Sequence, residues 1–201
     1  GALPADPVED TVARALTDLE SGESEIRRGA AMLLGKYPAH RAMIPALLGL
    51  LEDPDERVRR AAVVSLAENA ARLDGAEARR LLRALLDPDA EVRLGVAAFL
   101  PQLMLQATRV RNRDQGTVVI SGTDRDALEE ALLAALRDPL ADIRIQALEA
   151  LRFIPWRLPP EALAEILEDP EAEVRLTAYP VLLNRLNPLD FTAAALEAWP
   201  E

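Results

Sequence analysis

The sequence predicts an all-α protein, a right-handed α-solenoid of about five helical-hairpin repeats plus a terminal half repeat. The first observation is a repeated stretch, LEDPDERVRRAAVVSLAEN from Leu51, which recurs with variations at Leu19, Leu85, Leu136 and Leu167. The second is its period of about 32 residues, which is one helical-repeat length. The third is composition: half of the residues are apolar but only 3% are aromatic, as is typical of Ala- and Leu-rich helices packed on helices.

Each repeat is expected to be two helices joined by a short corner, because one such pair cannot bury its apolar face alone and must stack on a neighbour. Helix-breaking residues mark the joints: Pro4 and Pro7 keep residues 1–10 out of a helix, and Pro38 ends the first pair. We predict one domain, residues 1–201, whose repeats lie at about 11–38, 41–73, 76–107, 126–154 and 160–187.

One insertion interrupts the period after the third repeat, at residues 108–125. Its run Thr117–Ile120 is β-branched and Ser121-Gly122 ends it, which predicts an inserted β-hairpin or loop. Near the other end of the sequence, Asp190 can cap a terminal helix at 190–199, half of a sixth repeat.

The corner between the two helices has a repeated chemistry. An Asp-Pro pair precedes the second helix in four repeats and Ser21 takes its place in the first, and we expect these side chains to cap that helix. An arginine follows six residues later and can reach the aspartate of an adjacent repeat, which predicts a structural ladder of paired charges. The alternative is that the arginines bind anionic ligands. The residues are Asp53, Arg59, Asp87, Arg93, Asp138, Arg144, Asp169 and Arg175, with Arg27 in the first repeat.

The pattern D-P-x-x-x-V-R-x-x-A-x-x-x-L, as it stands from Asp53 to Leu66, resembles the HEAT repeat family, in particular the short bacterial form found in phycobilisome lyase-like proteins. The resemblance covers about Thr11 to Trp199 apart from the insertion. It implies protein-binding scaffolds or adaptors more often than enzymes. It also implies that the second helices line the concave face.

The outward face of the second helices becomes apolar toward the C-terminus. At 100° per residue, outward positions change from mixed ones such as Met32, Arg60 and Val64 to an apolar set. A protein seldom exposes such an apolar set unless it binds a partner there. The alternatives are that these residues are ordinary core, packed between helices or under the insertion, or that they form homodimer contacts. The predicted partner-binding residues on the concave face are Leu94, Ile145, Leu148, Leu176, Tyr179 and Leu183.

The insertion carries a second candidate surface. If it is extended, Arg109, Arg111 and Arg113 lie on one face and form a basic finger on an acidic protein. An acidic protein surface is the predicted target, phosphates are a weaker one, and a solvated hairpin that pairs with the protein's own carboxylates is the third interpretation.

Several kinds of chemistry have no support in the sequence. The absence of cysteine excludes disulfides and Cys-based zinc sites, and His40 is the single histidine. There is no glycine-rich phosphate loop. We therefore predict no enzyme, no catalytic residue, no metal and no cofactor. The net charge of −11 argues against nucleic acid and anionic membranes as partners.

The function predicted is a cytoplasmic, bacterial, non-enzymatic scaffold or adaptor that binds another protein or peptide, with a monomer favoured. One alternative is a nucleic-acid-binding or DNA-glycosylase-like HEAT protein, although Trp156 and Trp199 lie outside the second helices and the groove is not basic. Another is a bilin-lyase-like pigment-protein chaperone, suggested by the resemblance. A third is a fragment of a larger protein whose other domains hold the activity.

Overall fold

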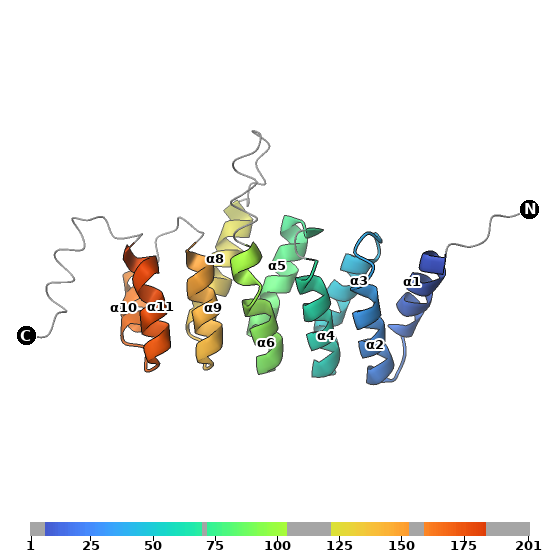
Figure 1. Ribbon diagram of the computed structural model, residues 1–201, viewed down its shortest axis with the longest axis horizontal. Coiled ribbons are helices and arrows are strands. Elements are labelled where there is room, and N and C mark those ends of the chain that lie inside the picture. Colours follow the sequence, from blue (N-terminus) through green and yellow to red (C-terminus); the bar gives the residue numbers. More distant parts are fainter. Residues whose placement is uncertain (1–6, 70–71, 104–121, 153–158, 184–201) are drawn as a thin grey trace, which may run out of the picture.

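The computed structural model describes residues 7–69, 72–103, 122–152 and 159–183, which form five pairs of helices stacked along one axis (Figure 1). The first helices of the pairs are α1 (Pro7–Asp18), α3 (Met43–Gly49), α5 (Gly75–Arg83), α8 (Gly122–Leu136) and α10 (Pro160–Leu167). The second helices are α2 (Ser24–Leu34), α4 (Glu56–Ala67), α6 (Ala90–Ala97), α9 (Ala141–Leu151) and α11 (Ala172–Leu183). No strand occurs in these residues, so the prediction of an all-α solenoid is confirmed.

The helices form two layers. In the front layer of Figure 1 the second helices lie side by side, and α2 contacts α4, α4 contacts α6, α6 contacts α9 and α9 contacts α11. In the other layer α3 contacts α5, α5 contacts α8 and α8 contacts α10. Short 3-10 turns, η1 (Leu50–Glu52) and η3 (Ala84–Leu86), extend α3 and α5 toward the corners. Each pair therefore covers the apolar face of its neighbour, as a solenoid requires.

The core runs the length of the stack between the two layers. The residue three positions after the repeated arginine is small in every second helix and at most 4% exposed. Larger side chains of the first helices, such as Leu47, Leu81 and Leu132, fill the space opposite. The small residues are Ala30, Ala62, Val96, Ala147 and Ala178. Alternating small and large side chains let the layers pack without voids.

A close approach joins α2 to α4. A Cβ added at Gly35 would lie 2.6 Å from the Ser65 hydroxyl oxygen, so only glycine fits there. The Ser65 hydroxyl donates to the carbonyl of Ala31 at 3.1 Å, and the Asn69 amide donates to the carbonyl of Gly35 at 3.2 Å. Both polar side chains are buried, and these hydrogen bonds satisfy them.

Two predicted boundaries are wrong, and one second helix is interrupted. Helix α1 includes Pro7, because a proline fits the first turn of a helix, where its missing N–H is not needed. Helix α8 begins at Gly122, so residues 122–125 belong to a helix and not to the insertion. Helix α6 ends at Ala97, because Pro101 has no N–H to bond to the carbonyl of Ala97, and residues 100–103 are helical again after a turn.

Two other predicted elements lie outside the described residues. These are residues 108–121 of the insertion and the terminal helix at 190–199. None of the helices that the structure describes is long and apolar enough to cross a membrane.

Candidate protein-binding surface

The corners are built on Asp-Pro, but the aspartate is not the helix cap. The Asp53 carboxylate accepts a hydrogen bond from the backbone N–H of Asp55 at 2.9 Å, which closes a turn around Pro54. Asp87, Asp138 and Asp169 make the same turn with the residue two positions later. The prediction that these four aspartates and Ser21 cap the second helices is therefore wrong.

The N-cap position lies two residues later. Asp55 caps α4 by accepting from the N–H of Arg57, and Asp89 caps α6 by accepting from the N–H of Val92. At α9 the N-cap is Leu140, whose side chain has no acceptor. The proline consequently stands just before the cap instead of at the first helical position.

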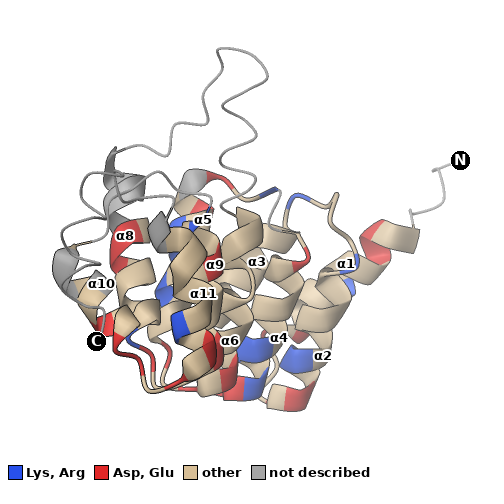
Figure 2. Cartoon of the chain, turned by 60° about the vertical axis from the view of Figure 1, so that its left-hand side comes forward, with Lys and Arg blue, Asp and Glu red and all other residues tan. Residues whose placement is uncertain are grey.

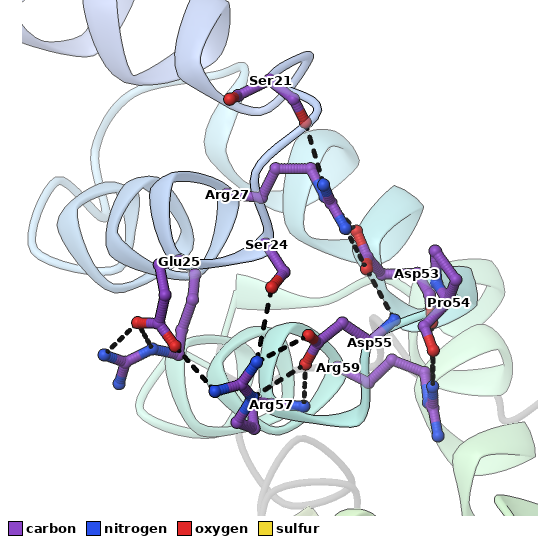
Figure 3. A network of polar contacts seen from close by, with 10 residues as sticks. Ser21, Ser24, Glu25, Arg27, Asp53, Pro54, Asp55, Arg57 and Arg59 are labelled. Carbon is purple, nitrogen blue, oxygen red and sulfur yellow. Dashed lines mark hydrogen bonds and ion pairs between the residues drawn. The ribbon is translucent and has the colours of Figure 1, made fainter.

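The repeated arginines connect each corner to the next. The Nε of Arg27 lies 2.7 Å from Asp53, and its Nη1 donates to the carbonyl of Ser21 in its own corner at 2.9 Å (Figure 3). Arg59 repeats this arrangement with Asp87. The four pairs of this Arg–Asp ladder are Arg27–Asp53, Arg59–Asp87, Arg93–Asp138 and Arg144–Asp169, each with an Nε to Oδ2 distance of 2.7 Å.

The ladder is a structural feature and not a ligand site. Its arginine side chains are 9–14% exposed and its aspartates 5–8%. In each pair two guanidinium nitrogens engage the carboxylate, and a third donates to a backbone carbonyl. An anionic ligand would have to displace a buried, doubly bonded carboxylate, so the alternative of anion binding by these four arginines has no support.

Arg175 is the fifth arginine of the series and differs from the others. Its Nη1 donates to the carbonyls of Asp169 and Pro170, like its predecessors in their own corners. Within the described residues it forms no ion pair with a carboxylate.

Charge also gathers around the ladder, along the lower edge of the molecule where the corners lie (Figure 2). Arg57 contacts Glu25 of the preceding repeat at 2.9 Å and Asp55 of its own at 3.0 Å. Arg60 contacts Asp89 of the following repeat through two hydrogen bonds of 2.8 and 2.6 Å. The basic side chains at this edge are thus neutralised by carboxylates of neighbouring repeats.

These ion pairs make the stability of the fold depend on pH. The guanidinium of Arg60 lowers the pKa of Asp89 to about 2, and the hydrogen bond from Arg27 lowers the pKa of Asp53. A carboxylate with a lowered folded-state pKa stabilises the fold above its unfolded-state pKa, and this stabilisation is lost as pH falls through the folded-state value. We expect the Tm to fall as pH decreases from about 4 to about 2, measured by circular dichroism.

The Asp89→Asn variant tests the assignment to this residue. It should have a lower Tm than the parent at neutral pH and a smaller decrease between about pH 4 and pH 2. An unchanged decrease would show that other carboxylates cause the acid sensitivity.

The face formed by the second helices exposes apolar side chains in a row. Met32 on α2 and Val64 on α4 occupy equivalent positions, five residues after the repeated arginine, and are 51% and 54% exposed. Ala98 is exposed at the same position after α6. Leu94 and Ile145, beside this row, are half-buried and pack against the core. We call Met32, Val64, Ala98, Leu94 and Ile145 the second-helix face.

The predicted partner-binding residues differ in exposure. Leu148 is 1% exposed and belongs to the core, so its prediction is wrong. Leu176 and Tyr179 are 66% and 55% exposed, and both lie on α11 at one end of the stack. The side chain of Leu183 and the predicted finger Arg109, Arg111 and Arg113 lie outside what the structure describes. Met32 and Val64 were both predicted to face outward. Each follows the repeated arginine by five residues, and this shared spacing is the sequence signal that groups them on one face.

One hollow at the corners has a largely charged lining. A cavity of about 370 Å³ lies between the fourth and fifth corners, where Arg137 contacts Glu165 at 2.7 Å. No group of three metal-ligating side chains occurs in the part of the chain that the structure describes. His40 contacts Glu9 at 3.2 Å and joins the first two repeats. Most of the residues that line the hollow are charged, whereas small-molecule sites are lined predominantly by apolar residues.

Comparisons with known proteins agree with this architecture. Residues 10–101 match the family model of HEAT repeats. Among solved structures, the chain is similar to the complex of CpcE and CpcF of phycocyanin lyase from Nostoc sp. PCC7120, at 23% identity and a TM-score of 0.59, over 96% of this chain and 73% of that one.

Two similar structures are not natural proteins. An engineered protein is 21% identical, with a TM-score of 0.61, over 87% of this chain and 78% of that chain. A computationally designed armadillo repeat protein for modular peptide recognition is 18% identical, with a TM-score of 0.61, over 90% of this chain and 84% of that chain. No curated protein sequence matches. Residues 10–101 therefore match HEAT repeats, and the helical pairs that follow continue the same solenoid fold.

Proposed function

We propose that this protein is a non-enzymatic scaffold that binds a segment of another protein on its second-helix face. The observation that carries the proposal is the pair Met32 and Val64, two apolar side chains more than half exposed at equivalent positions of neighbouring helices. Leu94 and Ile145 continue the apolar surface toward the C-terminal repeats. A row of this kind offers a partner apolar contacts at regular intervals along the stack.

The charges beside this face indicate what kind of segment fits. Arg28 contacts Glu25 at 2.8 Å and Arg60 contacts Asp89 at 2.6 Å, so these arginines already have partners. The segment should therefore dock through apolar side chains, as an amphipathic helix does in a groove. Because the net charge is −11, basic residues on the opposite side of that helix would favour association.

The comparisons support a protein partner in general terms. The phycocyanin lyase structure is a complex of two chains, and the designed armadillo protein was made for peptide recognition. The nucleic-acid alternative has less support, because the ladder arginines and Arg60 are all paired with carboxylates. The finger Arg109, Arg111 and Arg113 remains a proposed auxiliary contact for an acidic surface of the same partner.

The test compares two matched double variants in affinity capture from the source organism. Met32→Glu/Val64→Glu adds two negative charges to the second-helix face. Leu86→Glu/Leu167→Glu makes the same change at Leu86 in η3 and Leu167 in α10, which are 66% and 43% exposed. We expect the first variant to lose a partner that the parent and the second variant retain, and the parent should hold it in about 0.5 M salt, which screens charge contacts.

Each variant must first show the parent's helix content and unfolding midpoint. Loss of the partner from both variants would indicate a general effect of added charge and would contradict the proposed face. Retention by both would also contradict it. Release of the parent's partner by salt would favour the charged corners over the apolar row.

A further inference from the structure

The charge in the first turn of the second helices changes along the stack. Two positions before the repeated arginine, α2 has Glu25 and α4 has Arg57, and these side chains contact each other at 2.9 Å. In the last three second helices the same position holds Glu91, Asp142 and Glu173, all of them exposed. Among the described residues, none of these three side chains forms an ion pair or a hydrogen bond. We call Glu91, Asp142 and Glu173 the acidic flank.

The requirements of the fold do not explain this charge. A carboxylate in the first turn of a helix is favoured by the helix dipole, so the fold tolerates the acidic flank. Arg57 occupies the same position of α4, however, so the repeat does not require an acid there. The arginines beside the flank already have partners, since Arg60 bonds twice to Asp89 and Arg93 bonds twice to Asp138. The three carboxylates are therefore left for contacts outside the described chain.

The acidic flank lies beside apolar side chains. Leu94, Ile145 and Leu176 follow its three members by three residues, which is close to one helical turn, so each pair lies on one side of its helix. Leu94 and Ile145 belong to the second-helix face, and Leu176 is 66% exposed. The helices α6, α9 and α11 contact one another in that order. This half of the molecule therefore presents an apolar row and, parallel to it, a row of carboxylates.

We propose that the surface from α6 to α11 binds a basic amphipathic helix of another protein. The apolar stripe of that helix lies on Leu94, Ile145 and Leu176, and lysines or arginines beside the stripe contact the acidic flank. The inference rests on the proposed function and adds the chemistry of the partner. Charge complementarity selects it, because basic residues at this flank meet three carboxylates that no described residue neutralises. The paired charges of α2 and α4 offer no such contact.

The spacing of the repeats favours a helix over an extended strand. Packed helices lie about 8–10 Å apart, and about seven residues of a helix rise about 10.5 Å. A helix that crosses the stack therefore places equivalent side chains over successive second helices about every seven residues. Two residues of a strand span only about 6.7 Å, and a third turns the side chain to the opposite face. The basic residues of the partner should consequently recur about every seven residues.

Synthetic helical peptides of about 35 residues, one heptad for each second helix, provide the test. All carry the same leucine stripe. The first has a lysine beside the stripe in every heptad, the second has glutamine instead, and the third has the same lysines on the side away from the stripe. Fluorescence anisotropy with the full chain measures the Kd. The first peptide should bind about tenfold more tightly than the second, since each exposed ion pair contributes about two- to threefold, and the third should lie between them.

Two matched triple variants locate the contact. One replaces the acidic flank by the corresponding amides, Glu91→Gln/Asp142→Asn/Glu173→Gln. The control replaces three exposed carboxylates in or at the end of α1, α8 and α10, Asp10→Asn/Glu130→Gln/Glu168→Gln. Both lose the same charge, and both must show the parent's helix content and Tm. The first should lose the preference for the lysine peptide and the control should keep it. Salt raised from about 0.05 to about 0.5 M should reduce that preference.

The outcomes separate this inference from the proposed function. Equal affinity for the first two peptides, or an unchanged preference in the acidic-flank variant, would overturn the inference. Equal affinity for the first and third peptides would also overturn it, in favour of nonspecific charge attraction. In each case, weaker binding of all peptides to Met32→Glu/Val64→Glu would leave the proposed function standing. If the parent binds no peptide, the inference is wrong, and affinity capture decides the proposed function separately.

Discussion

Replacing Arg144 with alanine should lower the free energy of unfolding by about 3–5 kcal/mol, the cost of leaving a buried charge without its partner. Arg144 and Asp169 are each 8% exposed, and two hydrogen bonds of 2.7 and 2.9 Å join them. A third hydrogen bond, from Nη1 to the carbonyl of Asp138, is 2.7 Å long. The variant removes all three hydrogen bonds and leaves the Asp169 carboxylate buried without its charged partner. Urea unfolding followed by circular dichroism measures the loss.

Arg152 provides a matched control at the end of the same helix. It contacts Glu149 at 2.8 Å, but the two side chains are 47% and 35% exposed. Arg152→Ala should therefore change stability by about 0–1 kcal/mol, as is usual for surface ion pairs. Equal losses for the two variants would contradict the view that burial makes the ladder important.

A double-mutant cycle isolates the pair. Because Asp169→Asn removes the charge that Arg144 neutralises, the double variant should lose less than the sum of the single losses. Additive losses would show that Arg144 acts through its carbonyl contacts alone.

The ladder was predictable because it depends on two regularities of the sequence. Each repeat supplies one corner aspartate and one arginine, and stacking at a constant distance brings the arginine to the next corner. Arg93 pairs with Asp138 although an insertion lies between them in the chain. The insertion changes the sequence distance but leaves the stacking distance intact, so the pairing persists.

The position of the helix cap was not predictable from residue types alone. Asp53 and Asp55 both suit an N-cap, and Pro54 suits the first helical position. The structure resolves the choice through backbone conformation. Asp53 closes a turn with the N–H of Asp55, which leaves Asp55 extended at the cap. The same ambiguity exists at Asp87 and Asp89.

Burial on the second helices was only partly predictable. A helical period gives the angle of a side chain around its own helix, but it does not say which neighbour covers that side. Leu148 and Tyr179 share one offset, yet one is buried and the other exposed, because α11 covers α9 and no described helix follows α11. The candidate site therefore keeps Leu94 and Ile145 of the predicted set, loses Leu148 and gains Met32 and Val64.

Replacing Leu148 with alanine should destabilise the protein by about 2–5 kcal/mol, because it leaves a cavity at the contact between α9 and α11. Val64→Ala, at a site 54% exposed, should change stability by no more than about 0.5 kcal/mol. Chemical denaturation of both variants measures the difference. A small loss for Leu148→Ala would return this residue to the candidate partner-binding surface.

The helices that lose protection from hydrogen exchange give a second test of the same variant. Repeat proteins are stabilised by interactions between neighbouring repeats, so weakening one interface should affect the repeats beside it most. Hydrogen exchange should therefore accelerate in α11 of the Leu148→Ala variant while α2 and α4 keep the parent's protection. Uniformly faster hydrogen exchange along the stack would instead show that the five repeats unfold as one cooperative unit, so that no interface opens separately. Either pattern requires Leu148 to be core, since loss of an exposed contact would leave exchange unchanged throughout.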